Sequence, residues 1–340
     1  MPRVLVTGAT GLVGSYAALR LRDGGWTVRA LVRDPDAAAW LAREGAELAR
    51  GDVLDAASLA AAMRGCDAVV HTAATVVSGG GYEAYRRPNV DGTRLVVDAA
   101  AAAGARLAHV SSIAVYGASG RYDARATDEE TPLRPLAAGE LYARSKRESE
   151  AVVLDAHAAG RLWATALRPD VVYGRRDRQF VPRIARLVRR GVVPAVGGGD
   201  STLAVIHAAN VAEAIARALA HDGAGGRAYN VANEAPVTVR RFFELAARGL
   251  GRPVRTVRVP TAIVRAAVHA AAFGATLVGR GGMSAAVRAS VDFITRDNPF
   301  SSERARRELG WAPVIAPEVG VPDAFAWLAR HDGGENASGA

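Results

Sequence analysis

Short apolar runs alternate with longer amphipathic segments through the first half of the chain. Residues 4–6 form a continuous apolar run, and a segment with apolar positions at Tyr16, Leu19 and Leu21 follows it. A continuous run is typical of a parallel strand buried on both faces, and the spacing of the second segment indicates a helix. Further apolar runs at 28–32, 68–71, 107–110 and 164–167 continue the alternation. The pattern predicts an α/β fold with a doubly wound parallel sheet.

The pattern changes after about residue 175. A helix is expected at 180–190, short strands at 204–207 and 229–231, and mainly helices from residue 238 onward. We therefore expect a sheet domain made of residues 1–175 with about 204–232. A smaller, mostly helical C-terminal lobe would contain about 176–203 and 233–330. Residues 331–340, rich in Gly, Ser and Asn, are expected to form a disordered tail.

Three spaced glycines, Gly8, Gly11 and Gly14, lie between the first predicted strand and the first helix. Glycines let the backbone approach a pyrophosphate, and a helix N-terminus supplies free N–H groups and the positive end of its dipole. Spaced glycines alone are weak evidence, but the strand–loop–helix context is typical of a dinucleotide site. We expect the loop to bind a nicotinamide dinucleotide through Gly8, Thr10, Gly11, Leu12, Val13 and Gly14.

The end of the second predicted strand indicates which dinucleotide is bound. Asp or Glu at this position binds the ribose 2′-hydroxyl of NAD, whereas this strand is followed by Arg33, which can pair with the 2′-phosphate of NADP. NADP(H) is therefore favoured over NAD(H), although Asp34 comes next and could also turn toward the ribose. Asp52 and Val53 are expected at the cofactor, where the Asp52 carboxylate could hold the adenine amino group. The alternative is that Asp52 caps the next turn.

Tyr142 and Lys146 are four residues apart in a predicted helix, so both side chains lie on one face. A free tyrosine has a pKa of about 10 and is a poor base near neutrality, but a nearby ammonium lowers this pKa. Lys146 is the only lysine among 43 basic residues. It offers a compact point charge, whereas guanidinium is a wide planar fork. We expect Tyr142 to donate or accept the proton and Lys146 to be its electrostatic partner, which can also bind the nicotinamide ribose.

Two hydroxyls, those of Ser111 and Ser112, follow the apolar run that ends at Val110. This is the carboxyl end of a predicted strand, where doubly wound sheets bind ligands. A hydroxyl there can hydrogen-bond a substrate carbonyl and stabilise a developing alkoxide. A Ser-Ser pair alone is more often a turn or a cap, but together with Tyr142 and Lys146 it predicts a third member of a catalytic site.

Composition and charge exclude several classes of protein. Half of the 340 residues are hydrophobic, which is typical of a well-buried globular chain. Cys66 is the single cysteine, so an intramolecular disulfide is impossible and a reducing, cytoplasmic location is expected. The chain enters a strand at Arg3 without an apolar leader, so a secretory signal is not expected. The net charge of +9 comes from scattered basic residues without interleaved aromatics, so nucleic-acid binding is not expected. No metal site is predicted.

The segment at 259–279 is apolar and long enough to be considered as a membrane span. Arg265 and His269 lie within it, and Pro260 and Gly274 interrupt it, so stable membrane insertion is not expected. A buried or substrate-facing helix is the expected alternative.

These motifs together resemble the extended short-chain dehydrogenase/reductase family, in its epimerase/dehydratase-like branch. The matching stretches are TGATGLVG at 7–14, HTAA at 71–74, NVDGT at 89–93, SSIAVYG at 111–117, YARSK at 142–146 and LRPDVVYG at 167–174. Weaker matches follow at 205–211, 229–234 and 308–313. The resemblance implies a Rossmann fold, with the dinucleotide on the sheet domain and a small-molecule substrate on the C-terminal lobe.

The resemblance also implies individual roles. Ser112, which matches the family position better than Ser111, is the hydroxyl that contacts the substrate carbonyl, Tyr142 is the acid/base and Lys146 its partner. Further positions beside the cofactor, the last two against the nicotinamide, are Ala73, Asn89, Pro169 and Val172. Family members often form a homodimer through two helices, here at about 83–103 and 140–159, whose apolar faces could equally belong to the core.

The reaction is narrowed by what the chain lacks. Ile113 and Ala114 stand where sugar-nucleotide dehydratases of the family carry an Asp-Glu pair, and Arg33 departs from the acidic residue of sugar epimerases. Residues 28–35 are more similar to dihydroflavonol reductases and 3β-hydroxysteroid dehydrogenases. We therefore expect an NADP(H)-dependent enzyme that interconverts a ketone and a secondary alcohol on a small, hydrophobic substrate.

Two alternatives stay open. The first is an NAD-dependent sugar-nucleotide epimerase, in which Arg175 and Arg176 either contact a diphosphate or belong to a solvated turn. The second is a non-catalytic NADP(H)-sensing regulator on the same fold. Such regulators commonly lose the Tyr/Lys pair, so its retention makes this the least favoured reading.

Overall fold

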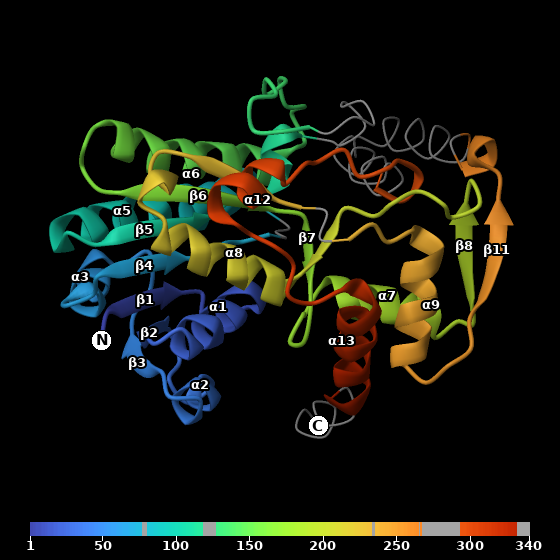
Figure 1. The fold of residues 1–340 in the computed structure, drawn as a ribbon, viewed down its shortest axis with the longest axis horizontal. Coiled ribbons are helices and arrows are strands. Elements are labelled where there is room, and N and C mark those ends of the chain that lie inside the picture. The colour runs from blue at the N-terminus through green and yellow to red at the C-terminus, as the bar shows by residue number, and fades with distance from the viewer. Residues whose placement is uncertain (77–79, 118–126, 233–234, 265, 267–292, 332–340) are drawn as a thin grey trace.

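The predicted α/β fold is confirmed, with seven parallel strands in the central sheet (Figure 1). The structure, a computed structural model, describes residues 1–76, 80–117, 127–232, 235–264, 266 and 293–331. The strand order is β10-β6-β5-β4-β1-β2-β3. The strands are β1 (Arg3–Thr7), β2 (Thr27–Val32), β3 (Glu47–Arg50), β4 (Ala68–His71), β5 (Arg106–Val110), β6 (Ala164–Pro169) and β10 (Ala228–Val231).

Helices cover both faces of this sheet because its strands are apolar on both sides. In β1, Val4 and Val6 pack into the core on one face, while Leu5 packs into the core on the other. The helices on the Val4 side are α1 (Leu12–Asp23), α2 (Ala39–Arg43), α8 (Ala208–Ala220) and α12 (Glu303–Leu309). Those on the Leu5 side are α3 (Ala56–Met63), α5 (Gly92–Ala103) and α6 (Leu141–Ala158). Two short helical turns, α4 (Glu83–Arg86) and a π-helical turn at Arg87–Asp91, lead into α5.

A second core lies beyond the end of the main sheet, on the right of Figure 1. Phe242 and Phe325 are fully buried there and face each other edge-on at 6.2 Å between ring centroids. The helices of this core are α7 (Phe180–Val188), α9 (Val239–Gly249) and α13 (Pro317–His331). Two parallel strand pairs accompany them, β7 (Val171–Tyr173) with β9 (Val205–His207) and β8 (Val192–Val196) with β11 (Arg255–Val259).

The expected elements at 180–190, 204–207 and 229–231 correspond to α7, β9 and β10. Only β10 joins the main sheet, whereas β9 pairs with β7. Strands β3, β7, β8 and β11 were not predicted. All four are short, at three to five residues. The sequences of β3 and β11 also lack an apolar run, and neither strand has a fully buried residue.

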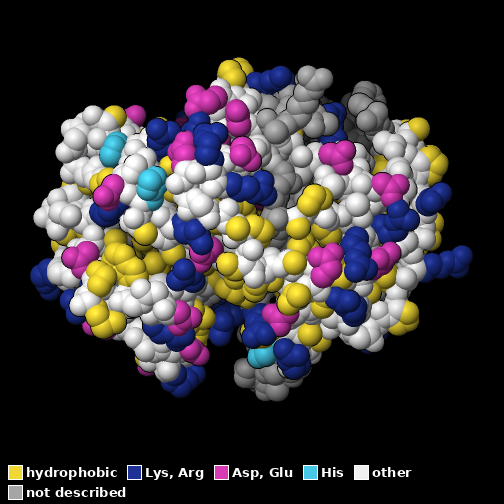
Figure 2. Space-filling model, viewed as in Figure 1, with side chains coloured by type: hydrophobic (Ala, Val, Ile, Leu, Met, Phe, Trp, Pro, Cys, Tyr) yellow, Lys and Arg dark blue, Asp and Glu magenta, His cyan; other side chains and the backbone are white. Residues whose placement is uncertain are grey.

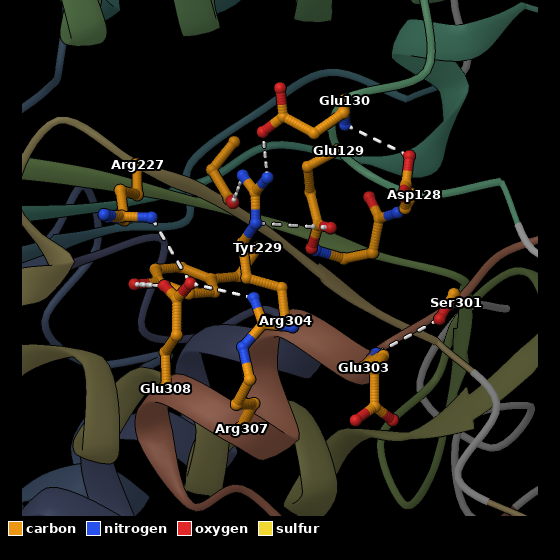
Figure 3. A network of polar contacts seen from close by, with 12 residues as sticks. Asp128, Glu129, Glu130, Arg227, Tyr229, Ser301, Glu303, Arg304, Arg307 and Glu308 are labelled. Carbon is orange, nitrogen blue, oxygen red and sulfur yellow. Dashed lines mark hydrogen bonds and ion pairs between the residues drawn. The ribbon is translucent and has the colours of Figure 1, made fainter.

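Polar contacts fasten the C-terminal segment to the edge strand β10 (Figure 3). Arg304 of α12 forms ion pairs with Glu129 and Glu130, which lie just before α6 in the chain. Glu308 accepts hydrogen bonds from Tyr229 at 3.0 Å and from Arg227 at 3.3 Å. The network therefore joins three segments that are far apart in the sequence.

The face drawn in Figure 2 carries interspersed basic and acidic side chains. Arg22–Glu44 and Arg161–Asp98 are examples of exposed ion pairs in the described part of the chain. Among the described residues, no helix combines the length and apolar character that crossing a membrane requires. Most of the segment at 259–279 lies outside the described residues, as does the expected tail apart from His331, which ends α13.

Candidate functional site

The candidate site begins at the carboxyl end of β5. Ser112 follows this strand and is the N-cap of a short 3-10 helix (Ile113–Tyr116), since its hydroxyl accepts a hydrogen bond from the Ala114 N–H at 3.1 Å. The same side chain interacts with Tyr142 and lowers the pKa of its phenol. The sequence left open whether this hydroxyl is a helix cap or part of a catalytic site. Ser112 is a cap, and it is also a neighbour of Tyr142, the predicted acid/base. Ser111 is buried as well, and its hydroxyl has no hydrogen-bond partner among the described residues.

Tyr142 lies in the first turn of α6, with Lys146 one turn further on, as the spacing predicted. Burial raises the pKa of Tyr142 to about 12, and the interaction with the Ser112 side chain opposes this rise. The charge of Lys146 is not among the causes of the shift, so the lowering that the spacing predicted is not found and the net direction is upward. A phenol with such a pKa is protonated at neutral pH and can donate a proton to an oxygen placed against it.

Lys146 is buried, and its side chain reaches the last residue of β5. Only 2 % of the residue is exposed, and Nζ donates to the Val110 carbonyl oxygen at 2.7 Å. Burial lowers the pKa of Lys146 to about 8, while the negative charge of Glu150 opposes this shift. This hydrogen bond holds the ammonium at the last residue of β5, directly before Ser111 and Ser112 in the chain.

A buried pair of histidines lies next to Lys146, and sequence reasoning missed it. His71 of β4 and His109 of β5 are register partners in the sheet, with ring centroids 5.3 Å apart. Burial, and secondarily the charge of Lys146, lowers the pKa of His71 to about 3 and that of His109 well below its usual value. Both rings are therefore neutral at neutral pH. The sequence did contain a signal for this pair, because a histidine lies near the end of each of the two predicted strands, at 68–71 and at 107–110.

The glycine loop has the tight geometry that a pyrophosphate cradle needs. A Cβ on Gly14 would lie 2.2 Å from the Gly8 carbonyl oxygen, and one on Gly8 would lie 2.7 Å from the Ala73 nitrogen. Gly8 has a φ of +69°, which side chains rarely adopt. Gly11 is the N-cap of α1, so Leu12 and Val13 begin the helix as predicted. The loop thus brings backbone N–H groups to the carboxyl end of β1, which suits a dinucleotide phosphate.

The acidic residues near the expected adenosine end are engaged in local turns. The Asp34 carboxylate accepts hydrogen bonds from the N–H groups of Asp36 at 3.0 Å and Ala37 at 3.2 Å. Asp52 accepts from the Leu54 N–H at 2.9 Å, as in the turn-capping alternative. Arg33, in contrast, is exposed immediately after β2. The only cation predicted for the 2′-phosphate is thus open to solvent, and the carboxylate beside it is held in a turn.

The other predicted cofactor positions surround the same edge of the sheet. Asn89 links the segment after β4 to α6, because its amide donates to the Thr75 carbonyl and to the Ser145 hydroxyl, both at 2.9 Å. Pro169 ends β6, and Val172 of β7 packs against the core on the α1 side. Among the described residues, no group of His, Cys, Asp and Glu could hold a metal ion.

A glycine cradle at β1 and a Ser–Tyr–Lys group at β5, on one edge of a doubly wound sheet, define an NAD(P)-dependent enzyme of the extended short-chain dehydrogenase/reductase type. Residues 4–232 match the NAD dependent epimerase/dehydratase family. The chain belongs to this family, as the motifs indicated.

Three similar proteins illustrate the range of the family. The chain is 33% identical over 323 residues to a 4-hydroxy-2-methyl-3-oxo-4-farnesyl-3,4-dihydroquinoline-1-oxide ketoreductase of Stigmatella aurantiaca, with 94% of each chain covered. It is 31% identical over 337 residues to a 2-alkyl-3-oxoalkanoate reductase of Stenotrophomonas maltophilia, covering 94% of this chain and 97% of that protein. The crystal structure of gox2253 matches with a TM-score of 0.78 and 28% identity, over 97% of this chain and 99% of that chain.

Proposed function

We propose that this chain is an NADP(H)-dependent oxidoreductase that interconverts a ketone and a secondary alcohol on a small, hydrophobic substrate. The observation that carries the proposal is the placement of Ser112 directly after β5, together with Tyr142 and the buried Lys146 one turn apart in α6, where Nζ of Lys146 is bound to the last carbonyl of β5.

A nicotinamide dinucleotide held at the glycine loop would supply or accept the hydride, and the side chains handle the substrate oxygen and its proton. The Ser112 hydroxyl orients the substrate oxygen by hydrogen bonding. In the reducing direction the protonated Tyr142 hydroxyl donates its proton to this oxygen, and in the oxidising direction the phenolate accepts it. The Lys146 ammonium stabilises the phenolate that reduction leaves behind.

Two relatives support a hydrophobic ketone as the substrate. One is named as a ketoreductase of a farnesylated dihydroquinoline oxide and the other as a reductase of 2-alkyl-3-oxoalkanoates. Both names describe a carbonyl group attached to an apolar body. Residues 267–292 of the C-terminal lobe that would recognise such a body lie outside the described residues.

Preference for NADP(H) is supported by the environment of Arg33. This guanidinium is exposed where the adenosine ribose is expected, and Asp34 is occupied by its own turn. A 2′-phosphate would therefore meet a cation without a competing carboxylate.

We propose that separate parts of the chain bind the cofactor and the substrate. Residues 1–175 with about 204–232 would bind the dinucleotide, and about 176–203 with 233–330 would bind the substrate. A homodimer through the helices at 83–103 and 140–159 and a cytoplasmic location complete the proposal.

The family description also makes a sugar-nucleotide epimerase the second candidate. A redox-neutral epimerase keeps its cofactor between turnovers, whereas a reductase exchanges it in every cycle. Nicotinamide fluorescence, measured on the purified protein before and after adding NADPH or NADH, separates the two. An empty site that prefers NADPH supports the reductase, whereas tightly retained NAD or a preference for NADH contradicts it and favours the epimerase.

A further inference from the structure

The segment that follows β7 crosses the beginning of α1. The Arg175 N–H donates to the Tyr16 hydroxyl at 3.1 Å. A Cβ on Gly174 would lie 3.4 Å from the Leu12 side chain, the first helical residue after the glycine loop. Residues 174–176 therefore lie beside the loop that is proposed to hold the cofactor pyrophosphate.

Arg176 extends from this crossing to α2. Its guanidinium carbon lies 4.0 Å from the centroid of the Trp40 ring, which is a cation–π contact. Trp40 packs against the core from α2, the helix that follows Arg33 and the end of β2. The segment thus runs from the start of α1, directly after the glycine loop, to α2, the helix that follows Arg33 in the chain.

The charge of Arg176 is left available for a ligand. Its neighbour Arg175 is paired with Asp323 through hydrogen bonds of 2.7 and 2.5 Å. Within the described parts of the chain, the Arg176 guanidinium has no hydrogen bond or ion pair to a carboxylate or carbonyl. An arginine stacked on an aromatic face keeps its N–H edges free, and these match phosphate oxygens.

The backbone at Arg176 is held in a conformation that favours glycine. Its φ of +67° is the only positive value for a non-glycine among the described residues. A side chain strains the backbone in this region, and such strained residues concentrate at ligand sites. Here the unusual backbone directs a cation over Trp40.

We infer that Arg176 is a phosphate-binding residue for the dinucleotide, held in place by Trp40. The inference rests on the proposed function, because it needs a nicotinamide dinucleotide on the glycine loop. The diphosphate and the 2′-phosphate share the same chemistry, and the choice of nucleotide distinguishes them.

The test is the Kd of the full-length protein for NADPH, NADH and 2′,5′-ADP, measured for the wild type and for Arg176→Gly. Glycine accepts the positive φ, so the melting temperature is expected to hold or rise. Loss of a charged hydrogen bond to phosphate is expected to raise the Kd about 10-fold or more. A rise for NADPH and 2′,5′-ADP alone assigns Arg176 to the 2′-phosphate, whereas a rise for NADPH and NADH with 2′,5′-ADP unchanged assigns it to the diphosphate.

Two further variants sharpen the result. Arg178→Ala removes an exposed arginine two residues away and is expected to leave all three Kd values unchanged. Trp40→Leu keeps the charge but removes its platform, and a partial loss of affinity is expected. Unchanged Kd values in Arg176→Gly, with a wild type that binds NADPH, overturn the inference and leave the proposed function intact. A wild type that binds neither nicotinamide nucleotide overturns both.

Discussion

At the scale of single residues, burial decides the protonation of the candidate site. Burial shifts both groups toward their neutral forms, because it moves the pKa of the Tyr142 phenol up to about 12 and that of the Lys146 ammonium down to about 8. At neutral pH the phenol is protonated and Lys146 is still mostly charged. The sequence predicted the pairing from spacing and from the lone lysine. It could not predict the direction of the tyrosine shift, because burial depends on helices and strands that are distant in the chain.

The single lysine makes its titration directly observable. Protein labelled with carbon-13 at the lysine side chain has one such residue to report, Lys146. We expect an NMR titration to give a pKa near 8 in the folded protein. This group then costs stability below about pH 8, where it is charged in both states. The cost is relieved as the pH rises toward its unfolded value of about 10.4, because only the unfolded state then binds the proton. A folded-state pKa at the unfolded value would refute the buried placement.

Lysine and arginine are not interchangeable at this position. Nζ of Lys146 is 2.7 Å from the Val110 carbonyl oxygen, in a place where only 2 % of the residue is exposed. The wider guanidinium of Lys146→Arg cannot occupy it without moving the neighbours. We expect kcat/KM for the ketone to fall about 100-fold or more, measured on protein shown to be folded by circular dichroism. Wild-type activity in this variant would remove the argument drawn from the lone lysine.

At the scale of elements, the strands and helices that build the cofactor edge were the predictable ones. The apolar runs at 68–71, 107–110 and 164–167 became β4, β5 and β6, since each is buried on both faces. Strand β11 escaped prediction because it has no fully buried residue to mark it. The histidine pair escaped because it depends on which strands are neighbours, and that is a property of topology.

The glycine loop gives an element-scale prediction. A methyl group in Gly14→Ala would lie 2.2 Å from the Gly8 carbonyl oxygen, so the loop or the start of α1 must move. We expect the Kd for NADPH to rise at least about 10-fold and the melting temperature to fall, by fluorescence titration and thermal melting. Gly81→Ala is the matched control, because nothing lies within 4 Å of the added Cβ and no positive φ is required. Equal effects of the two substitutions would contradict the close approach at Gly14.

At the scale of the whole molecule, a buried ion pair fastens α6 to the central sheet. Arg168 of β6 and Glu150 of α6 approach to 2.5 Å, with side chains 8% and 6% exposed. Arg168 also donates to the Tyr116 hydroxyl at 2.8 Å. The contacts in Figure 3 likewise hold α12 against β10. Such links were invisible in the sequence, because they join residues that only the folded chain brings together.

Removing one partner of the buried pair tests its role. Glu150→Ala leaves the Arg168 charge buried without its carboxylate, which is expected to cost about 3 to 5 kcal/mol in the free energy of unfolding. Urea unfolding measures this change. Asp98→Ala removes the carboxylate of the exposed Arg161–Asp98 pair, 48% and 59% exposed, and should cost less than about 1 kcal/mol. Similar losses in the two variants would show that the buried pair has no special role.

The central claim is that Tyr142 transfers the proton in ketone reduction by NADPH. The most direct measurement follows the loss of NADPH absorbance with 2-alkyl-3-oxoalkanoates and related apolar ketones, for the wild type and Tyr142→Phe. We expect ketone-dependent oxidation of NADPH by the wild type, and a fall in kcat of about 100- to 10,000-fold in the variant with an unchanged Kd for NADPH. Unchanged turnover in Tyr142→Phe, or a wild type that binds NADPH but reduces none of these ketones, would contradict the account.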